Sequence, residues 1–172
     1  SLSVVCALTE TVVAEMGLDD CTFHLECIVD ERGVARLVEV AARPAGDFIA
    51  SHLVTLATGV SFPENVLRVA TGVRPVLAER ADLYAGVRKV LATEEGVFEG
   101  LDGIEKACNV PGLRHLVVER AQGASVSLPP ADYASSTLAA VVVTGDSAEY
   151  LHRRLEQATD LLTPRITPRE HG

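Results

Sequence analysis

The sequence has few aromatic side chains, a deficit of basic residues and no long apolar run. Aromatic residues make up 4% of the 172 residues and tryptophan is absent, whereas hydrophobic residues make up 48%, so an aliphatic core is expected with apolar surface left for another chain or domain. Fifteen basic against twenty-four acidic side chains give a net charge of -9. This charge repels nucleic acid and anionic lipid, which excludes both as expected partners.

The cysteines show no C-x-x-C spacing of the kind that binds metal. They are Cys6, Cys21, Cys27 and Cys108, and their even number is compatible with disulfides or with none. The last three lie among apolar residues, which predicts reduced, buried thiols in a cytoplasmic protein. No base is adjacent to any of them, so a nucleophilic cysteine is not expected.

Targeting segments and glycine-rich phosphate loops are also missing from the pattern. Runs such as STLAAVVVTG are far shorter than a bilayer span, and the amino end lacks the basic flank and cleavage site of a secretory signal, so no membrane partner is expected. The glycines form no Walker or Rossmann motif. The start at Ser1 favours a processed or recombinant chain or a fragment.

Hydrophobic periodicity predicts an α+β fold in which antiparallel sheet and helices form layers. The first block, residues 1–76, has an amphipathic helix that stops at Gly17, a hairpin with the turn DERG, and two helices. These two helices cover about residues 48–58, with Asp47 as the expected cap, and residues 63–72.

A second block, residues 77–172, begins where the texture loosens around GVRPVLAERA. Its expected strands are 83–91, 97–99, 114–119 and 137–144, with a helix over 103–108 and a Pro-Pro loop before the last strand. A final helix is expected to have Asp146 as its N-cap and Glu149 three residues on. PRITPREHG is expected to be a tail or a short strand.

Side-chain parity in the hairpin raises the functional question. Glu26 alternates with an apolar set of side chains and therefore points away from the core. A two-residue turn at Arg32 and Gly33 places Glu26 directly across from Glu39, and a slip of one residue would separate them. Like charges about 5 Å apart at such a pair are destabilising unless a cation lies between them.

A divalent cation is one solution, and a solvated pair of glutamates is the simpler alternative. Carboxylate oxygens suit Mg²⁺ or Mn²⁺, and Mg²⁺ is usually held by one or two carboxylates together with nucleotide phosphates. Arg43 on the same face could meet a carboxylate or phosphate through its planar fork of donors. His24 and His52 are expected to have structural or solvated roles.

The stretch FHLECIVDERGVARLVEVAARPAGDFIASHLVTLATGVSFPENVLRVATGVRP resembles the end of an ATP-grasp domain, with a glutamate strand, a turn, a strand of the E-x-N-x-R type, a glycine loop and two helices. L-amino-acid ligases and related carboxylate-amine ligases are the nearest resemblance, and biotin carboxylase is more distant. GLDGIEKACNVPGLRHLVVERAQGASV resembles the small C-terminal subdomain that follows. The resemblance implies that Glu26 and Glu39 are ligands of the Mg²⁺ bound to ATP and that Arg43 positions the carboxylate or acyl phosphate.

Two departures from the family accompany this resemblance. The family's metal-binding asparagine is Ala41 here, which removes an oxygen ligand and puts a second metal ion in doubt. The N-terminal part of an ATP-grasp enzyme, with its ATP-binding lysine and mobile loop, is absent, so this chain alone is expected to be inactive without that part in cis or in trans. A homodimer stays open as an assembly.

Two functional hypotheses follow. The first is the C-terminal portion of an ADP-forming carboxylate-amine ligase, which joins amino acids or a related acid and amine through an acyl phosphate. The second is a non-catalytic binding or assembly module that descends from such a ligase and has lost the ligand at Ala41. Carboxylation or purine-type ligation would keep the fold and change only the substrate.

Overall fold

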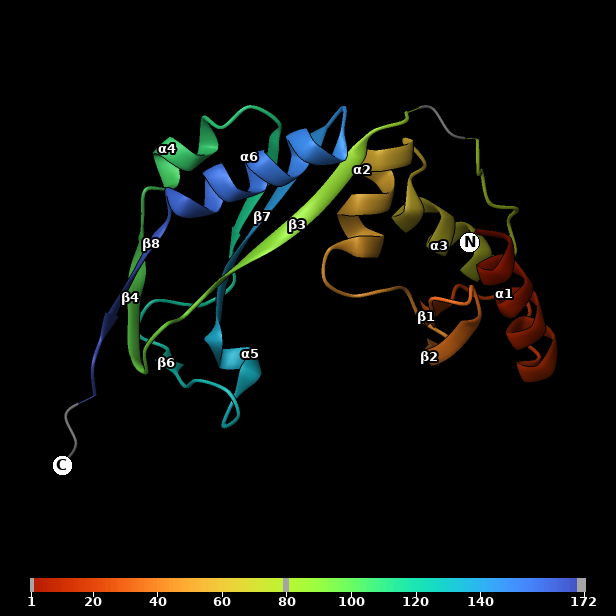
Figure 1. The fold of residues 1–172 in the computed structure, drawn as a ribbon, viewed down its shortest axis with the longest axis horizontal. Coiled ribbons are helices and arrows are strands. Elements are labelled where there is room, and N and C mark those ends of the chain that lie inside the picture. The colour runs from red at the N-terminus through yellow and green to blue at the C-terminus, as the bar shows by residue number, and fades with distance from the viewer. Residues whose placement is uncertain (1, 79–80, 170–172) are drawn as a thin grey trace. The chain divides into compact units, whose positions relative to one another are not determined.

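Helix α1 (Leu2–Met16) opens the chain in the computed structural model, which describes residues 2–78 and 81–169. It ends at Gly17 as predicted, because the φ of 62° at this glycine lies in the left-handed region that terminates helices. Figure 1 shows α1 beside the antiparallel hairpin of β1 (His24–Val29) and β2 (Ala35–Ala41), on which the helix packs. Val12 is the buried residue of this helix.

The next helical segments also lie close to the residue ranges predicted from the sequence. A short π-helical turn, η1 (Ile49–Leu53), continues directly into α2 (Val54–Thr58), which stops at Gly59 with φ 72°. Helix α3 (Phe62–Ala70) carries Pro63 in its first turn, where a missing N–H costs nothing. The two helices predicted between the hairpin and the loosened segment are therefore confirmed.

The predicted capping role of Asp47 is wrong. The N-cap position of η1 is Phe48, and no side-chain cap hydrogen bond is formed there. Asp47 and Phe48 both have left-handed backbones, with φ of 47° and 67°. Asp47 thus lies in the turn before η1, one residue ahead of the N-cap position that it was predicted to occupy.

The chain divides into two compact units by packing. The first unit comprises residues up to Thr55 and those from Gly59 to the boundary before Ala81. The second unit comprises Leu56–Thr58 and the chain from Ala81 onward. The domain limits 1–76 and 77–172 expected from the sequence stay a prediction.

The second unit contains two three-stranded antiparallel sheets, in the orders β3-β7-β5 and β6-β4-β8. Its strands and helices are β3 (Tyr84–Leu91), β4 (Gly96–Asp102), α4 (Ile104–Cys108), β5 (Leu113–Val118), β6 (Ser125–Val126), α5 (Tyr133–Ser136), β7 (Thr137–Gly145), α6 (Ala148–Asp160) and β8 (Thr163–Thr167). The mixed helix and antiparallel sheet architecture predicted from the sequence is confirmed.

Strand β7 is the centre of the second unit. Residues 138–143 are all fully buried, which explains their unbroken aliphatic composition. Helix α6 packs along β3 and β7 and places Leu155 and Ala158 in the core (Figure 1). The backbone at Gly103, before α4, lies close to the backbone at Leu161, after α6. Any side chain at Gly103 would collide with the carbonyl oxygen of Leu161.

In this unit the sequence predictions are wrong at one helix cap, miss two short elements and include the correct alternative for the final segment. The N-cap of α6 is Ser147, whose Oγ accepts a hydrogen bond from the backbone N–H of Tyr150 at 3.1 Å, so the choice of Asp146 was wrong by one residue. Strand β6 and helix α5 were not predicted, because both are shorter than a periodic pattern can reveal. The final segment forms β8, one of the two predicted alternatives.

The cysteines are more exposed than expected. Cys6, Cys21 and Cys108 are exposed and Cys27 is half-buried, and all four are free thiols. The prediction of buried thiols is therefore wrong for Cys21 and Cys108, which lie at the edges of elements rather than within them. Within residues 2–78 and 81–169, no helix has the length and apolar character needed to cross a bilayer.

Candidate functional site

The hairpin turn has three residues rather than the predicted two. Asp30 and Val34 close the loop with a backbone hydrogen bond of 3.0 Å, and Gly33 takes a φ of 76°. A three-residue loop that ends in a left-handed glycine is a common hairpin connection. The Asp30 carboxylate rigidifies it by accepting hydrogen bonds from the backbone N–H groups of Arg32 and Val34, both at 3.0 Å.

A β-bulge at Val38 compensates for the longer turn. Next to the loop the strands pair with an offset of one residue from the predicted register, so that Cys27 lies opposite Leu37. Beyond the bulge, Glu26 lies directly opposite Glu39. The predicted opposition of the two glutamates is therefore confirmed, although the two-residue turn from which it was deduced was wrong.

Each glutamate has a partner from its own side of the hairpin. The Oε1 atom of Glu26 lies 2.9 Å from Nε2 of His24, two residues earlier on the same face of β1. The Oε1 atom of Glu39 lies 3.4 Å from Nη2 of Arg43. The Glu26 and Glu39 side chains are 54% and 51% exposed, so a solute can reach both carboxylates.

Arg43 lies in a turn after β2, whereas the alternation of side chains in the sequence had assigned it to the strand itself. Strand β2 ends at Ala41, and the backbone N–H of Arg43 bonds to the Ala41 carbonyl oxygen at 2.8 Å, which closes a three-residue turn. One guanidinium nitrogen, Nη1, donates to the carbonyl oxygen of Pro44 at 3.1 Å, while Nη2 meets Glu39. The guanidinium thus remains near the Glu39 carboxylate even though the strand has ended.

The donor set fits a hard divalent cation that keeps other ligands. Two opposed carboxylates supply oxygen atoms of the kind that Mg²⁺ and Mn²⁺ prefer. Within the described part of the chain, no group of three or more histidine, cysteine, aspartate or glutamate side chains could hold a metal ion. Glu26 and Glu39 therefore suit an ion that is completed by phosphate oxygens and water, and not a closed protein cage.

His24 has a closer relation to the site than the sequence indicated. It lies directly opposite Ala41, the position at which the resemblance calls for asparagine, and its side chain is 17% exposed. The alternating pattern H-x-E on β1 was the available signal. His52, by contrast, is half-buried on η1. It contacts Ser51 Oγ at 2.7 Å, and its ring lies 5.3 Å from that of Phe48 between centroids, tilted by 56°.

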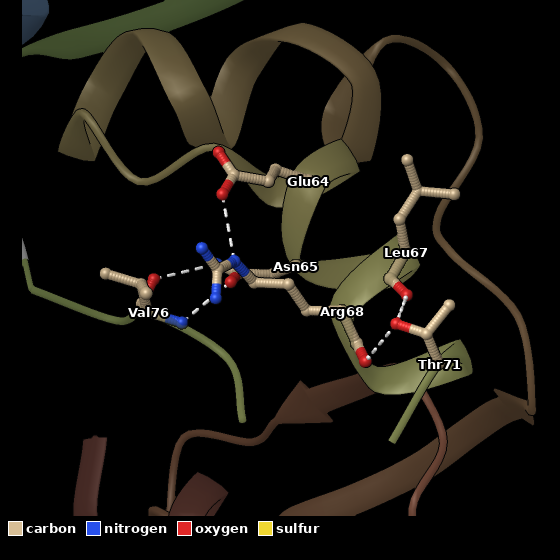
Figure 2. Close-up of polar contacts among 6 residues, drawn as sticks. All are labelled: Glu64, Asn65, Leu67, Arg68, Thr71 and Val76. Carbon is tan, nitrogen blue, oxygen red and sulfur yellow. Dashed lines mark hydrogen bonds and ion pairs between the residues drawn. The ribbon is translucent and has the colours of Figure 1, made fainter. Parts of the chain in front are cut away.

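A hollow of about 160 Å³ lies beside α3, and Figure 2 shows the polar contacts that this helix makes. The buried Asn65 side chain holds the backbone of Val76 with hydrogen bonds of 2.8 Å to its carbonyl and 2.7 Å from its N–H. Glu64 and Arg68 form an ion pair of 2.8 Å at the rim. Asn65, which sequence analysis missed, thus ties the segment after α3 back onto that helix.

Comparisons with known proteins agree with this fold. The chain is similar to L-amino acid ligase from Bacillus licheniformis at 22% identity and a TM-score of 0.80, with 97% of this chain and 44% of that chain covered. It is similar to phosphoribosylglycinamide synthetase from Anaerococcus prevotii at 9% identity and a TM-score of 0.83, with 96% and 42% covered. A biotin carboxylase–beta-gamma-ATP complex from Campylobacter jejuni gives 17% identity and a TM-score of 0.69, with 98% and 37% covered.

The chain therefore has the fold of the C-terminal part of the ATP-grasp ligases, which confirms the resemblance seen in the sequence. Within it, residues 88–167 match the family model described as L-amino acid ligase C-terminal domain 2. Comparison with curated proteins gives no match. The chain spans less than half the length of the solved structures to which it is similar.

Proposed function

We propose that the chain is the C-terminal portion of an ATP-dependent, ADP-forming carboxylate-amine ligase of the L-amino-acid ligase type. The observation that carries this proposal is the opposition of Glu26 and Glu39 beside the Arg43 guanidinium, on a fold shared with ATP-grasp ligases. In the complete enzyme a carboxylate oxygen attacks the terminal phosphorus of ATP and ADP leaves. An amine then attacks the acyl phosphate, and phosphate and a proton are released as the amide forms.

In this proposal, Glu26 and Glu39 hold the Mg²⁺ or Mn²⁺ that accompanies ATP. When bound, the ion neutralises negative charge on the transferring phosphoryl group, which is the main need of such reactions. Arg43 supplies fixed donors to the acid or to the phosphoryl oxygens, and its bond to Pro44 pre-orients the guanidinium. The part of the enzyme outside this chain supplies the remaining contacts with ATP, and we propose it as the principal partner.

The test is reconstitution with the missing N-terminal part, either fused or as a separate polypeptide. We expect ADP formation that depends on both an acid and an amine, measured with a panel of amino acids. Glu39→Gln should lower this rate at least about 100-fold, because it removes a charged ligand from the metal. Glu31→Gln is the matched control, because Glu31 is an exposed glutamate in the turn of the same hairpin and its neutralisation should leave the rate within about twofold.

The non-catalytic module remains the second candidate, favoured by Ala41, which offers no oxygen ligand where the family has asparagine. It predicts a reconstituted protein that is folded but inactive with every amino acid tried. It also predicts that Glu39→Gln changes nothing measurable. Amine-dependent ADP formation that Glu39→Gln abolishes would exclude this candidate.

A further inference from the structure

We propose that His24 is a positioning residue that fixes the Glu26 carboxylate for the metal ion, an inference that rests on the proposed function. The contact between His24 Nε2 and Glu26 Oε1 is 2.9 Å, which is an ordinary hydrogen-bond length. The imidazole is mostly buried at 17% exposure, whereas the carboxylate is 54% exposed. A ring held by the protein therefore restrains a carboxylate that would otherwise rotate freely in solvent.

The pairing of the strands shows why a histidine fits at this position. His24 lies directly across from Ala41, and their side chains share the face that carries Glu26 and Glu39. The methyl group of Ala41 leaves room for an imidazole beside it, and it supplies no polar group of its own.

Each of the two glutamates thus has one contact that restrains it, and the contact of Glu26 is the shorter, at 2.9 Å against 3.4 Å. Arg43 holds one oxygen of Glu39, and His24 holds one oxygen of Glu26. In this proposal the second oxygen of each carboxylate binds the cation. Carboxylates that bind metals are commonly fixed by such hydrogen bonds, and loss of the partner typically costs about 10–100-fold in metal affinity.

The geometry favours positioning over direct ligation by His24. The Nε2 atom is already engaged by Glu26, and imidazole is a preferred ligand of Zn²⁺, Cu²⁺ and Fe²⁺, whereas Mg²⁺ and Mn²⁺ prefer oxygen. A tautomer with hydrogen on Nε2 donates to the carboxylate and leaves its charge available to the ion. The proposed role depends on this hydrogen bond and not on a change in the charge of the ring.

The test is Mn²⁺ binding to the 172-residue chain, followed by the electron paramagnetic resonance signal of free Mn²⁺ and without any substrate. We expect one bound ion in the wild type, with water in place of the phosphate oxygens, and loss of binding in Glu26→Gln and Glu39→Gln. His24→Ala should raise the dissociation constant by about 10–100-fold. His24→Gln, whose amide N–H can replace the Nε2–H donor, should bring the dissociation constant back to within about threefold of the wild-type value. The matched control is His152→Ala, which removes an exposed His–Glu pair of 3.2 Å on α6 and should leave the dissociation constant unchanged.

The outcomes separate this inference from the proposed function. If Glu26→Gln and Glu39→Gln abolish binding but His24→Ala binds as tightly as wild type, the positioning role is wrong and the metal site stands. If His24→Ala lowers the melting temperature without changing the dissociation constant, the role is only structural. If the wild type binds no Mn²⁺, or if neither glutamate matters, the metal site is wrong and the role of His24 falls with it.

Discussion

Single side chains in this protein take roles that depend on the neighbour they can reach. Glu26 and Glu39 are alike in chemistry and exposure, yet one is restrained by a histidine and the other by an arginine. Asp132 caps the short helix α5 by accepting a hydrogen bond from Ser135 N–H at 3.0 Å, and this bond lowers the pKa of its carboxyl below the ordinary value of 3.8. Ser147 caps α6 in the same way, next to an aspartate that does not.

The cap of α6 gives a prediction that distinguishes these two neighbours. Ser147→Ala should destabilise the protein by about 1 kcal/mol, because the Tyr150 N–H loses its acceptor at the start of the helix. Asp146→Ala is the control and should change the free energy of unfolding by less than about 0.5 kcal/mol. Urea titrations monitored by circular dichroism would measure both, and a larger effect from Asp146→Ala would show that the cap is assigned to the wrong residue.

At the scale of elements, the sequence predicts features that have a recognisable pattern, such as helices and their ends. It does not predict a feature that depends on a single residue, such as a β-bulge. The stops at Gly17 and Gly59 were predicted because left-handed glycines have a recognisable local signal. The bulge at Val38 has none, since the sequence LVEV reads as a regular strand. Opposition of the two glutamates was predicted correctly only because the turn and the bulge shift the register in opposite directions.

The position of Arg43 shows a related limit. Strand parity placed it on the face of Glu39, and its guanidinium does lie 3.4 Å from that carboxylate. The route is a turn after Ala41, however, which no alternation pattern describes. The roles proposed for Glu26, Glu39 and Arg43 rest on the family resemblance, because opposed carboxylates alone do not distinguish a metal site from a solvated surface.

The segment after α3 supplies an element-scale prediction. Asn65→Ala should destabilise the first unit by about 1–3 kcal/mol, because it leaves the N–H and carbonyl of Val76 without their side-chain partner (Figure 2). Limited proteolysis should then cut the chain faster around Val76. Thr71→Ala is the control, since its hydroxyl bonds only to exposed carbonyls of α3, and equal cleavage of both variants would contradict the role of Asn65.

At the scale of the whole molecule, the two units differ in how much core they possess. The second unit has a contiguous cluster built around β7, including Phe98, Leu138 and Val141. In the described residues of the first unit, the buried hydrophobic side chains are Val12 and Ala50, and Ile28 and Val38 of the hairpin are exposed. Apolar side chains left at the surface of this unit are available to pack against another domain or chain.

This difference in core predicts unequal protection from hydrogen exchange. Backbone amides of β7 should exchange at least about 100-fold more slowly than those of β1 and β2, because the hairpin can open without disrupting the buried cluster. Mass spectrometry of peptides after timed deuteration would measure this. Equal protection in both units would mean that they unfold together, and it would contradict the view of a sparse first core.

The bulge at Val38 also separates two parts of the hairpin for protein engineering. Glu31, Arg32 and Gly33 are exposed, and the offset that they introduce is cancelled before the chain reaches Glu39. A fluorophore or a short affinity tag attached at this loop would therefore lie on the far side of the bulge from the two glutamates. A change in the loop should leave the pairing of Glu26 with Glu39 in place. The hairpin thus offers a reporter position close to the proposed ion site but outside it.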